Sequence, residues 1–202
     1  KSYEANFGQH GLAADIASIT IERSSDGGHA IHHVSELGAV IKTVAIPNKI
    51  HVVVGGPPCQ GFSPLGRMND WSSEDPRNTL WVYFMNVVAE LLPDIFLIEN
   101  VPQILTSRQG QEILNRAHDL GYYLATPGIL DASQFGVPQK RKRAFILGSR
   151  IGPIALPRPV NQLRTVRDAF SCLPDPTTDP LHKLRNPTAK SIERYKVIPE
   201  GG

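Results

Sequence analysis

The chain has 202 residues, of which 41% are hydrophobic and 20% charged, and its formal net charge is +2. These values are typical of a soluble globular domain. They exclude a disordered or membrane-spanning chain, because no apolar run approaches the length that crosses a bilayer. The two cysteines form no disulfide framework, which indicates a reducing compartment, and we recognise no signal or transit peptide.

The N-terminal quarter of the chain carries few clear signals. The stretch Ser24–Gly28 predicts a turn, because serine, aspartate and glycine cluster there. The histidines His29, His32 and His33 lack the cysteine or acidic partners of a metal site, so we expect no bound metal. Residues 34–46 are apolar enough for a helix or for irregular packing, and the pattern does not decide between the two.

A thiol stands on the loop that leaves the next predicted strand. Residues 50–54 are apolar and β-branched, and two glycines end the run, which predicts a short buried strand. Two prolines stiffen the loop, which would present Cys59 at a sheet edge, as a nucleophile requires. A lone cysteine is more often a small buried hydrophobe, so the residues around Cys59 decide its interpretation. The polar segment 64–78 predicts a disordered connection or a lid over a ligand.

A helix and a second strand follow this segment. Apolar residues recur at helical spacing over residues 80–91 and Pro93 ends the pattern, which predicts a helix of about four turns. Residues 94–98 form the next apolar run. A strand, a helix and a strand in this order imply a parallel pair. Parallel strands would place Cys59 and Glu99 at the same edge of the sheet.

The following region alternates helix and strand. Residues 113–120 carry the apolar face of a second helix, and residues 122–130 are strand-like. In the extended segment that ends at residue 147, side chains two apart share a face, so Lys140 and Lys142 point to one side. The residues that point to the other side are Gln139, Arg141 and Arg143.

Basic residues gather in the same region without acids. Between Gln139 and Arg167 the sequence has eight lysine and arginine residues and no aspartate or glutamate. Alone, such a run is more often a solvated face than a binding site. The alternative interpretation is a surface that contacts phosphates. Further along, Thr165 and Asp168 have the spacing of a helix start.

Four blocks of sequence, in this order, resemble the cytosine-C5 DNA methyltransferases. A weak block runs from Tyr3 to Ile16, Pro57–Gln60 resembles the nucleophile motif, and Glu99–Val101 and Gln139–Arg143 match two further motifs. The resemblance covers most of the chain. It implies an α/β fold with a mostly parallel sheet and flanking helices, which is the Rossmann-like core of S-adenosylmethionine-dependent methyltransferases.

The same resemblance implies that this core is truncated at both ends. We expect residues 1–160 to form the catalytic core without its N-terminal donor-binding loop. We expect the proline-rich residues 161–202 to lead towards a DNA-recognition region that the sequence does not include.

By the resemblance, the reaction transfers a methyl group from S-adenosylmethionine to C5 of a cytosine that is flipped out of DNA. Cys59 would add to C6 of the ring, which breaks the aromaticity of the ring and makes C5 nucleophilic. Glu99 would contact N3 and the exocyclic amine of the base, and Arg143 would hold O2 with help from Arg141. Nearby positive charge would favour the thiolate form of the cysteine.

The other site residues implied by the resemblance fall into two groups. The cofactor-binding residues are Asp15, Ile16, Pro58 and Leu80. The residues that contact the substrate or hold the framework of the site are Gln60, Ser63, Asn100 and Gln139. For Asp15, a role in capping a helix is an equally good interpretation.

Taken together, the sequence predicts a DNA cytosine-5 methyltransferase of a bacterial restriction-modification system. Such an enzyme would act as a monomer on double-stranded DNA in the cytoplasm, associated with the nucleoid and not with a membrane. Methylation of RNA cytosine and a catalytically silent DNA-binding paralogue are the alternatives. A thiol hydrolase is disfavoured, because no histidine block accompanies Cys59.

Overall fold

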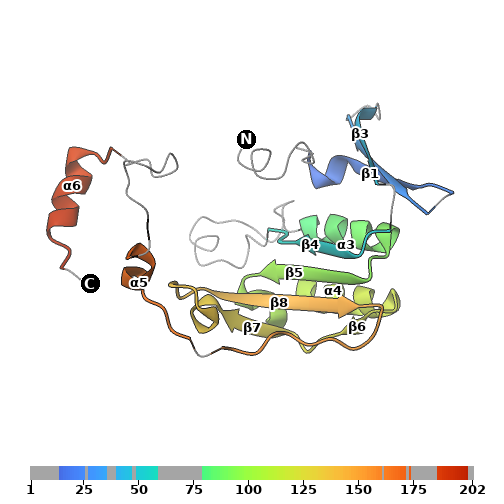
Figure 1. Ribbon diagram of the computed structural model, residues 1–202. Coiled ribbons are helices and arrows are strands. Elements are labelled where there is room, and N and C mark those ends of the chain that lie inside the picture. The colour runs from blue at the N-terminus through green and yellow to red at the C-terminus, as the bar shows by residue number, and fades with distance from the viewer. Residues whose placement is uncertain are drawn as a thin grey trace.

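The structure, a computed structural model, describes residues 14–25, 27–35, 40–46, 49–58, 79–160, 162–171, 173 and 186–199. Figure 1 shows a central sheet with helices behind it, a smaller sheet above, and short helices beyond one end of the central sheet. The 3-10 helices are written η. In chain order the elements are η1 (Ile16–Ser18), β1 (Ile19–Arg23), β2 (His29–Val34), β3 (Val40–Ile46), β4 (Val52–Gly55), α3 (Leu80–Leu91), β5 (Ile95–Asn100), η4 (Pro102–Thr106), α4 (Arg108–Asp119), β6 (Tyr123–Leu124), β7 (Gly128–Asp131), η5 (Ala132–Phe135), β8 (Lys142–Ser149), α5 (Val166–Phe170) and α6 (Ala189–Lys196).

The smaller sheet is an antiparallel meander of β1, β2 and β3. The turn predicted between β1 and β2 is confirmed, since the Gly27 N–H donates to Ser24 O and Gly27 takes a positive φ of 89°. Residues 34–46, which the sequence left undecided, contribute strand β3 and not a helix. Ile19 and Ile21 share one face of β1 and line a cavity that residues of α3 also line. The smaller sheet therefore lies against that helix.

The central sheet has the strand order β4-β5-β8-β6, with β7 also paired to β8. The predicted α/β class is confirmed, since helices flank the sheet (Figure 1). β4 and β5 are parallel, as the order of strand, helix and strand predicted. The pairs of β8 with β5, β6 and β7 are antiparallel, so the described sheet is mixed and not mostly parallel. The ten residues between β7 and β8 are too few for the crossover that a parallel pair needs.

Two helices cover one face of this sheet. α3 forms where the apolar spacing predicted it. It ends where Leu92 turns into the left-handed region (φ 43°) and donates its N–H to Val88 O, directly before Pro93. Burying one large apolar side chain stabilises a fold by about 1.5–3 kcal/mol, so the layer between helices and sheet is the main source of stability. Its buried members are Phe84, Met85, Val88, Phe96, Ile98, Ile113, Ala117, Tyr122 and Ile146.

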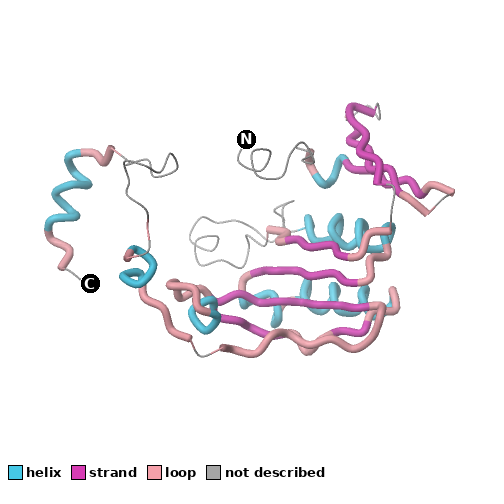
Figure 2. Tube along the Cα trace, viewed as in Figure 1, coloured by secondary structure: helices cyan, strands magenta, loops and turns pink. Residues whose placement is uncertain are grey.

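The outer edge of the sheet, beside β8, is interrupted. β6 pairs with the end of β8 and β7 with its beginning, while Ala125 keeps its N–H bonded to β8 and Pro127 falls in the gap. After β8 the chain turns back below the sheet (Figure 2), and the Val160 N–H donates to Gln134 O. The segment that follows β8, residues 153–160, is called the return segment, and this bond holds its last residue to η5.

α5 and α6 lie beyond the end of the sheet (Figure 1). α5 begins as predicted, because Thr165 and Asp168 form a capping box in which each side chain accepts the backbone N–H of the other residue. Apolar side chains in this part, such as Leu163, Phe170 and Tyr195, are exposed. Within the described ranges, no helix is long and apolar enough to cross a membrane.

A salt bridge joins the amino ends of β4 and β5. The Asp94 carboxylate, 13% exposed, accepts hydrogen bonds from Lys49 and from His51 Nδ1, the latter at 2.6 Å. These two bonds, that of Lys49 foremost, hold the pKa of Asp94 below its ordinary value of 3.8. Their stabilising effect is therefore complete above pH 3.8 and is lost only as the pH falls through the lowered pKa.

Gly55 ends β4 where the strand lies against α3. A β-carbon built on Gly55 would lie 2.4 Å from the ring of the buried Phe84, so the close approach of strand and helix requires a glycine. At the neighbouring Gly56 a β-carbon would meet nothing nearer than 3.5 Å, which is ordinary contact.

We expect Gly55→Ala to lower the free energy of unfolding by about 1–3 kcal/mol, which is the usual cost of overpacking a filled core. Urea titration followed by circular dichroism measures this change, and Gly56→Ala is the matched control. Equal stability of the two variants would contradict the close packing of β4 on α3.

One buried side chain ties the carboxyl ends of β4 and β5 together. Asn100, 7% exposed, donates from Nδ2 to Pro57 O at 3.0 Å, and its Oδ1 accepts the N–H of Val101 at 2.8 Å. The oxygen and the nitrogen of the amide both have partners, as buried polar atoms require. The loop that leaves β4 is thereby held beside the end of β5.

Asn100→Asp keeps the shape of the side chain but turns an oxygen towards Pro57 O. We expect the free energy of unfolding to fall by about 1–3 kcal/mol, because a part-buried acceptor loses its donor and two oxygen atoms then face each other. The control is Asn115→Asp on the exposed side of α4, where an aspartate still accepts the hydrogen bond from Gln111. Urea titration compares the two, and an N100D protein as stable as N115D would show that this bond does not hold the loop.

Candidate active site

Three charged side chains meet at the edge where β5 ends and β8 begins, on the left in Figure 1. Along β5, alternate residues are buried towards the helices, whereas Glu99 points to the other face and its side chain is 37% exposed. Glu99 Oε1 lies 2.9 Å from Arg143 Nε and 3.7 Å from Arg141 Nη2. A carboxylate is thus held between two guanidinium groups, and its bond with Arg143 is charge-assisted.

The register of the strands brings the arginines to Glu99. β5 and β8 pair so that Asn100 lies opposite the third residue of β8, which places Arg143 and Arg141 at the end of β5. Their side chains are 26% and 48% exposed, respectively. The predicted alternation is confirmed for these two residues, since both approach the same carboxylate and Lys142 between them is exposed.

The loop that follows β4 lies beside the carboxylate of Glu99. A β-carbon built on Gly56 would lie 3.5 Å from Glu99 Oε2, so the second oxygen of this carboxylate faces the start of the loop. The next residue, Pro57, is anchored by Asn100. The predicted framework role of Asn100 therefore has a physical basis in the bond that it makes.

Part of the predicted site lies outside the described residues. Pro58 is the last described residue of the loop, and it is exposed. The predicted site residues beyond it are Cys59, Gln60 and Ser63, together with the segment 64–78 predicted as a connection or lid. Their positions and roles stay predictions.

The predicted cofactor-binding residues near the N-terminus lie where η1 meets α3. Asp15 is exposed, and its Oδ1 accepts the Ala17 N–H at 2.9 Å, so the capping interpretation is confirmed. Ile16 is half-buried and packs against the core. Leu80, the first residue of α3, is also half-buried. The elements η1 and α3 that carry or follow these residues are in contact, and none of the three residues is among the described partners of Glu99.

Gln139 is exposed, and its backbone N–H donates to Val137 O at 2.8 Å. The described partners of Glu99 are the two arginines, and Gln139 is not one of them. Its framework role stays a prediction.

Asp131, which the sequence analysis did not single out, lies at the base of the loop before β8. Its Oδ1 accepts the Ser133 N–H at 3.1 Å, the Ser133 hydroxyl at 2.9 Å and the Arg141 N–H at 3.2 Å. The bonds from Ser133 foremost hold the pKa of Asp131 below its ordinary value, so the side chain is a carboxylate at neutral pH. An aspartate with a serine two residues on is a common turn signal, which alone does not mark a site.

An apolar cavity of about 420 Å³ borders Arg141 and Arg143 on the face of the sheet away from α3 and α4. Low-polarity walls beside the guanidinium groups strengthen the electrostatic interactions that these groups make. The apolar lining residues are Leu97, Leu130, Ala132, Phe135, Phe145, Leu147, Leu156 and Pro157.

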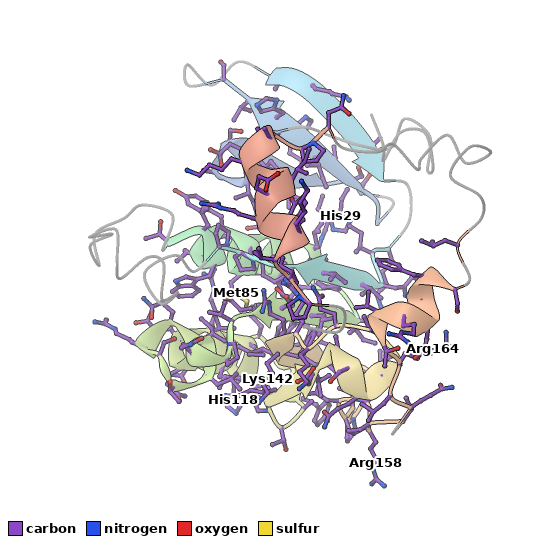
Figure 3. All side chains as sticks on the ribbon, turned by 90° about the vertical axis from the view of Figure 1, so that its left-hand side faces the viewer. His29, Met85, His118, Lys142, Arg158 and Arg164 are labelled. Carbon is purple, nitrogen blue, oxygen red and sulfur yellow. The ribbon has the colours of Figure 1, made fainter. Side chains whose placement is uncertain are left out.

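Figure 3 views the molecule from this charged edge. Lys142, Arg158 and Arg164 of the basic run are exposed, and Arg158 extends outward at the periphery. Over the described part of the chain, histidine, cysteine and acidic side chains form no group of three that could hold a metal ion.

Comparison with curated proteins finds relatives among the Type II methyltransferases. The Type II methyltransferase M1.HphI of Haemophilus parahaemolyticus is 31% identical over 212 residues, which cover 100% of this chain and 52% of the relative. The Type II methyltransferase M.HpaII of Haemophilus parainfluenzae is 30% identical over 220 residues, which cover 100% of this chain and 55% of the relative. The chain therefore spans about half the length of these relatives.

Among solved structures, the Dnmt2 methyltransferase of S. pombe aligns with 84% of this chain and 43% of its own, at 23% identity and a TM-score of 0.49. The family described as C-5 cytosine-specific DNA methylase matches residues 1–193. The resemblance seen in the four sequence blocks is thereby confirmed, and the chain belongs to the C-5 cytosine-specific DNA methylase family.

Proposed function

We propose that this chain is the catalytic core of a DNA cytosine-5 methyltransferase that uses S-adenosylmethionine as methyl donor. The observation that carries the proposal is the charged edge, where Glu99 lies between Arg143 and Arg141 beside the loop that continues into Cys59. A thiol, a carboxylate and two guanidinium groups are what a reaction through a covalent cytosine adduct requires.

Each of these residues has a task in the reaction. The Cys59 thiolate adds to C6 of the ring, forming a C–S bond, and the electron pair of the C5–C6 double bond makes C5 a nucleophile. Glu99 holds N3 and the exocyclic amine while Arg143, assisted by Arg141, holds O2, so that charge in the ring is stabilised. After C5 has taken the methyl group, loss of the C5 proton to a base expels the thiolate.

The described residues fit one part of the methyl donor. S-adenosylmethionine, when bound, supplies the methyl group as an electrophile. Ile16 offers an apolar side chain where η1 meets α3, Leu80 is the first residue of that helix, and Asp15 adds an exposed carboxylate. An apolar wall with an acceptor beside it suits a purine ring that carries an exocyclic amine. Pro58 is assigned to the cofactor-binding residues by the family resemblance alone.

A thiol cannot reach a cytosine that is stacked in a duplex, so the base must be flipped out at a cost of a few kcal/mol. The exposed basic residues between 139 and 167 offset part of this cost by contacts with phosphates. Gln60, Ser63 and Gln139 hold the loops around the base in this proposal.

We assign residues 1–160 to the catalytic core and residues 161–202 to the connection towards a DNA-recognition region. The position of α5 and α6 beyond the end of the sheet supports this division (Figure 1). The protein acts as a monomer on double-stranded DNA in the bacterial cytoplasm, associated with the nucleoid. The similarity to Type II methyltransferases supports a role in a restriction-modification system.

A DNA duplex of random sequence with 5-fluorocytosine in place of cytosine should trap the protein, at its full natural length, as a covalent adduct. Elimination of the thiolate requires C5 to lose a proton, and fluorine cannot replace it because it would have to leave as a cation, so the adduct persists after methyl transfer. Denaturing electrophoresis detects the adduct, and mass spectrometry of the digested complex locates the modified residue at Cys59.

The two cysteines of this chain provide the controls. Cys59→Ala should form no adduct, whereas Cys172→Ala should form one like the wild type. DNA binding without an adduct would indicate a catalytically silent paralogue. An adduct with fluorinated RNA and none with DNA would indicate an RNA methyltransferase.

Glu99→Gln removes the charge that pairs with both arginines and the group that can carry a proton to the ring. We expect single-turnover methylation to slow by about 10²–10⁴-fold, the usual contribution of a positioned acid or base, with DNA affinity close to the wild type. The control is Glu112→Gln, since Glu112 pairs with Arg108 on the surface of α4. Equal losses of rate and affinity in E99Q would make Glu99 a binding residue only.

A further inference from the structure

We propose that Asp131 is a positioning residue for the methyl-transfer reaction, because its carboxylate holds the backbone of Arg141 at the charged edge. The inference rests on the proposed function. Asp131 has no described contact with Glu99, and in this proposal it acts on the reaction only through Arg141.

The need for such a residue follows from where β8 begins. The strand runs from Lys142 to Ser149, so Arg143 is held by the ladder, paired with Leu130 of β7. Arg141 precedes the strand and ends the loop of ten residues that starts at Ala132. A side chain on a free loop end would not keep a guanidinium group at a fixed distance from a carboxylate.

Two hydrogen bonds hold the Arg141 backbone instead. Asp131 Oδ1 accepts the Arg141 N–H at 3.2 Å, and the Ala132 N–H donates to Arg141 O at 3.0 Å. Both polar groups of the residue are thus fixed to the end of β7. With its backbone fixed on both sides, Arg141 can direct its side chain at Glu99, from which Nη2 lies 3.7 Å away.

The same carboxylate shapes the other end of the loop. Its bonds with the N–H and hydroxyl of Ser133 cap η5, and Gly136 ends η5 with a positive φ of 78°. One oxygen atom thus joins the first turn of the loop to its last residue. A positioning role is therefore different from ordinary capping, which would involve Ser133 alone.

Positioning of Arg141 and ordinary capping of η5 predict different behaviour of variants in the protein at its full natural length. Asp131→Ala loses all three bonds, and we expect single-turnover methylation of a DNA duplex to slow by about 10–100-fold, as misplacement of a reacting group does. Asp131→Asn keeps an oxygen in the same place and should stay close to the wild-type rate. Ser133→Ala removes only the hydroxyl donor and should also stay close to it.

A double-mutant cycle with Arg141→Ala tests whether Asp131 acts through Arg141. We expect the D131A/R141A protein to be no slower than R141A, because the group that Asp131 positions is already gone. Additive losses would overturn the inference, and so would an active D131A enzyme with the wild-type rate. DNA affinity should be equal in D131A and the wild type. A loss of affinity as large as the loss of rate would assign Asp131 to DNA binding.

A second variant and the adduct assay separate failure of the positioning role from failure of the proposed function. If D131A does not fold, Asp131→Ser replaces it in the cycle, because the shorter side chain cannot bond Ser133 and Arg141 together. An inactive wild-type enzyme that forms no adduct would refute the proposed function. An active wild type with an unaffected D131A or D131S variant would refute the positioning role alone.

Discussion

At the end of β5, two successive side chains point to opposite faces of the sheet. Asn100 turns inward, where its amide holds the loop after β4, and Glu99 turns outward, where its carboxylate meets two arginines. A shift of β5 by one residue would exchange the two and bury a carboxylate beneath α3 and α4. The burial of Phe96 and Ile98 in the same strand prevents that shift, so the hydrophobic core fixes the geometry of the charged edge.

The direction of β8 is the second condition for this edge. Because β8 runs antiparallel to β5, the start of β8 lies beside the end of β5, and Arg143 reaches Glu99. A parallel β8 would carry its first residues to the opposite edge, where Asp94 binds Lys49 and His51. The short loop between β7 and β8, closed by Asp131, is therefore what allows residues 44 positions apart in sequence, Glu99 and Arg143, to form an ion pair.

Sequence patterns predicted the elements that depend on residues close to one another in the chain. Helical spacing and Pro93 gave α3, and the order of strand, helix and strand gave the parallel pair of β4 and β5. Strand β3 was not predicted, because a short apolar run becomes a strand only through its pairing with β2. The direction of β8 depends likewise on its neighbours. The residues of the charged edge came from resemblance to a family, whereas Asp131 was missed because its bond to a residue ten positions later leaves no local pattern.

The gap between β6 and β7 bears on how the protein avoids aggregation. A long, regular strand at the border of a sheet offers a row of free N–H and C=O groups to which another molecule can add a strand. Here that border consists of two short strands, with Pro127 between them lacking an N–H, and the return segment packs Leu156 close to Gly128. This side of the sheet is therefore a poor template for growth into fibrils, even in a crowded cell where unfolded chains are close by.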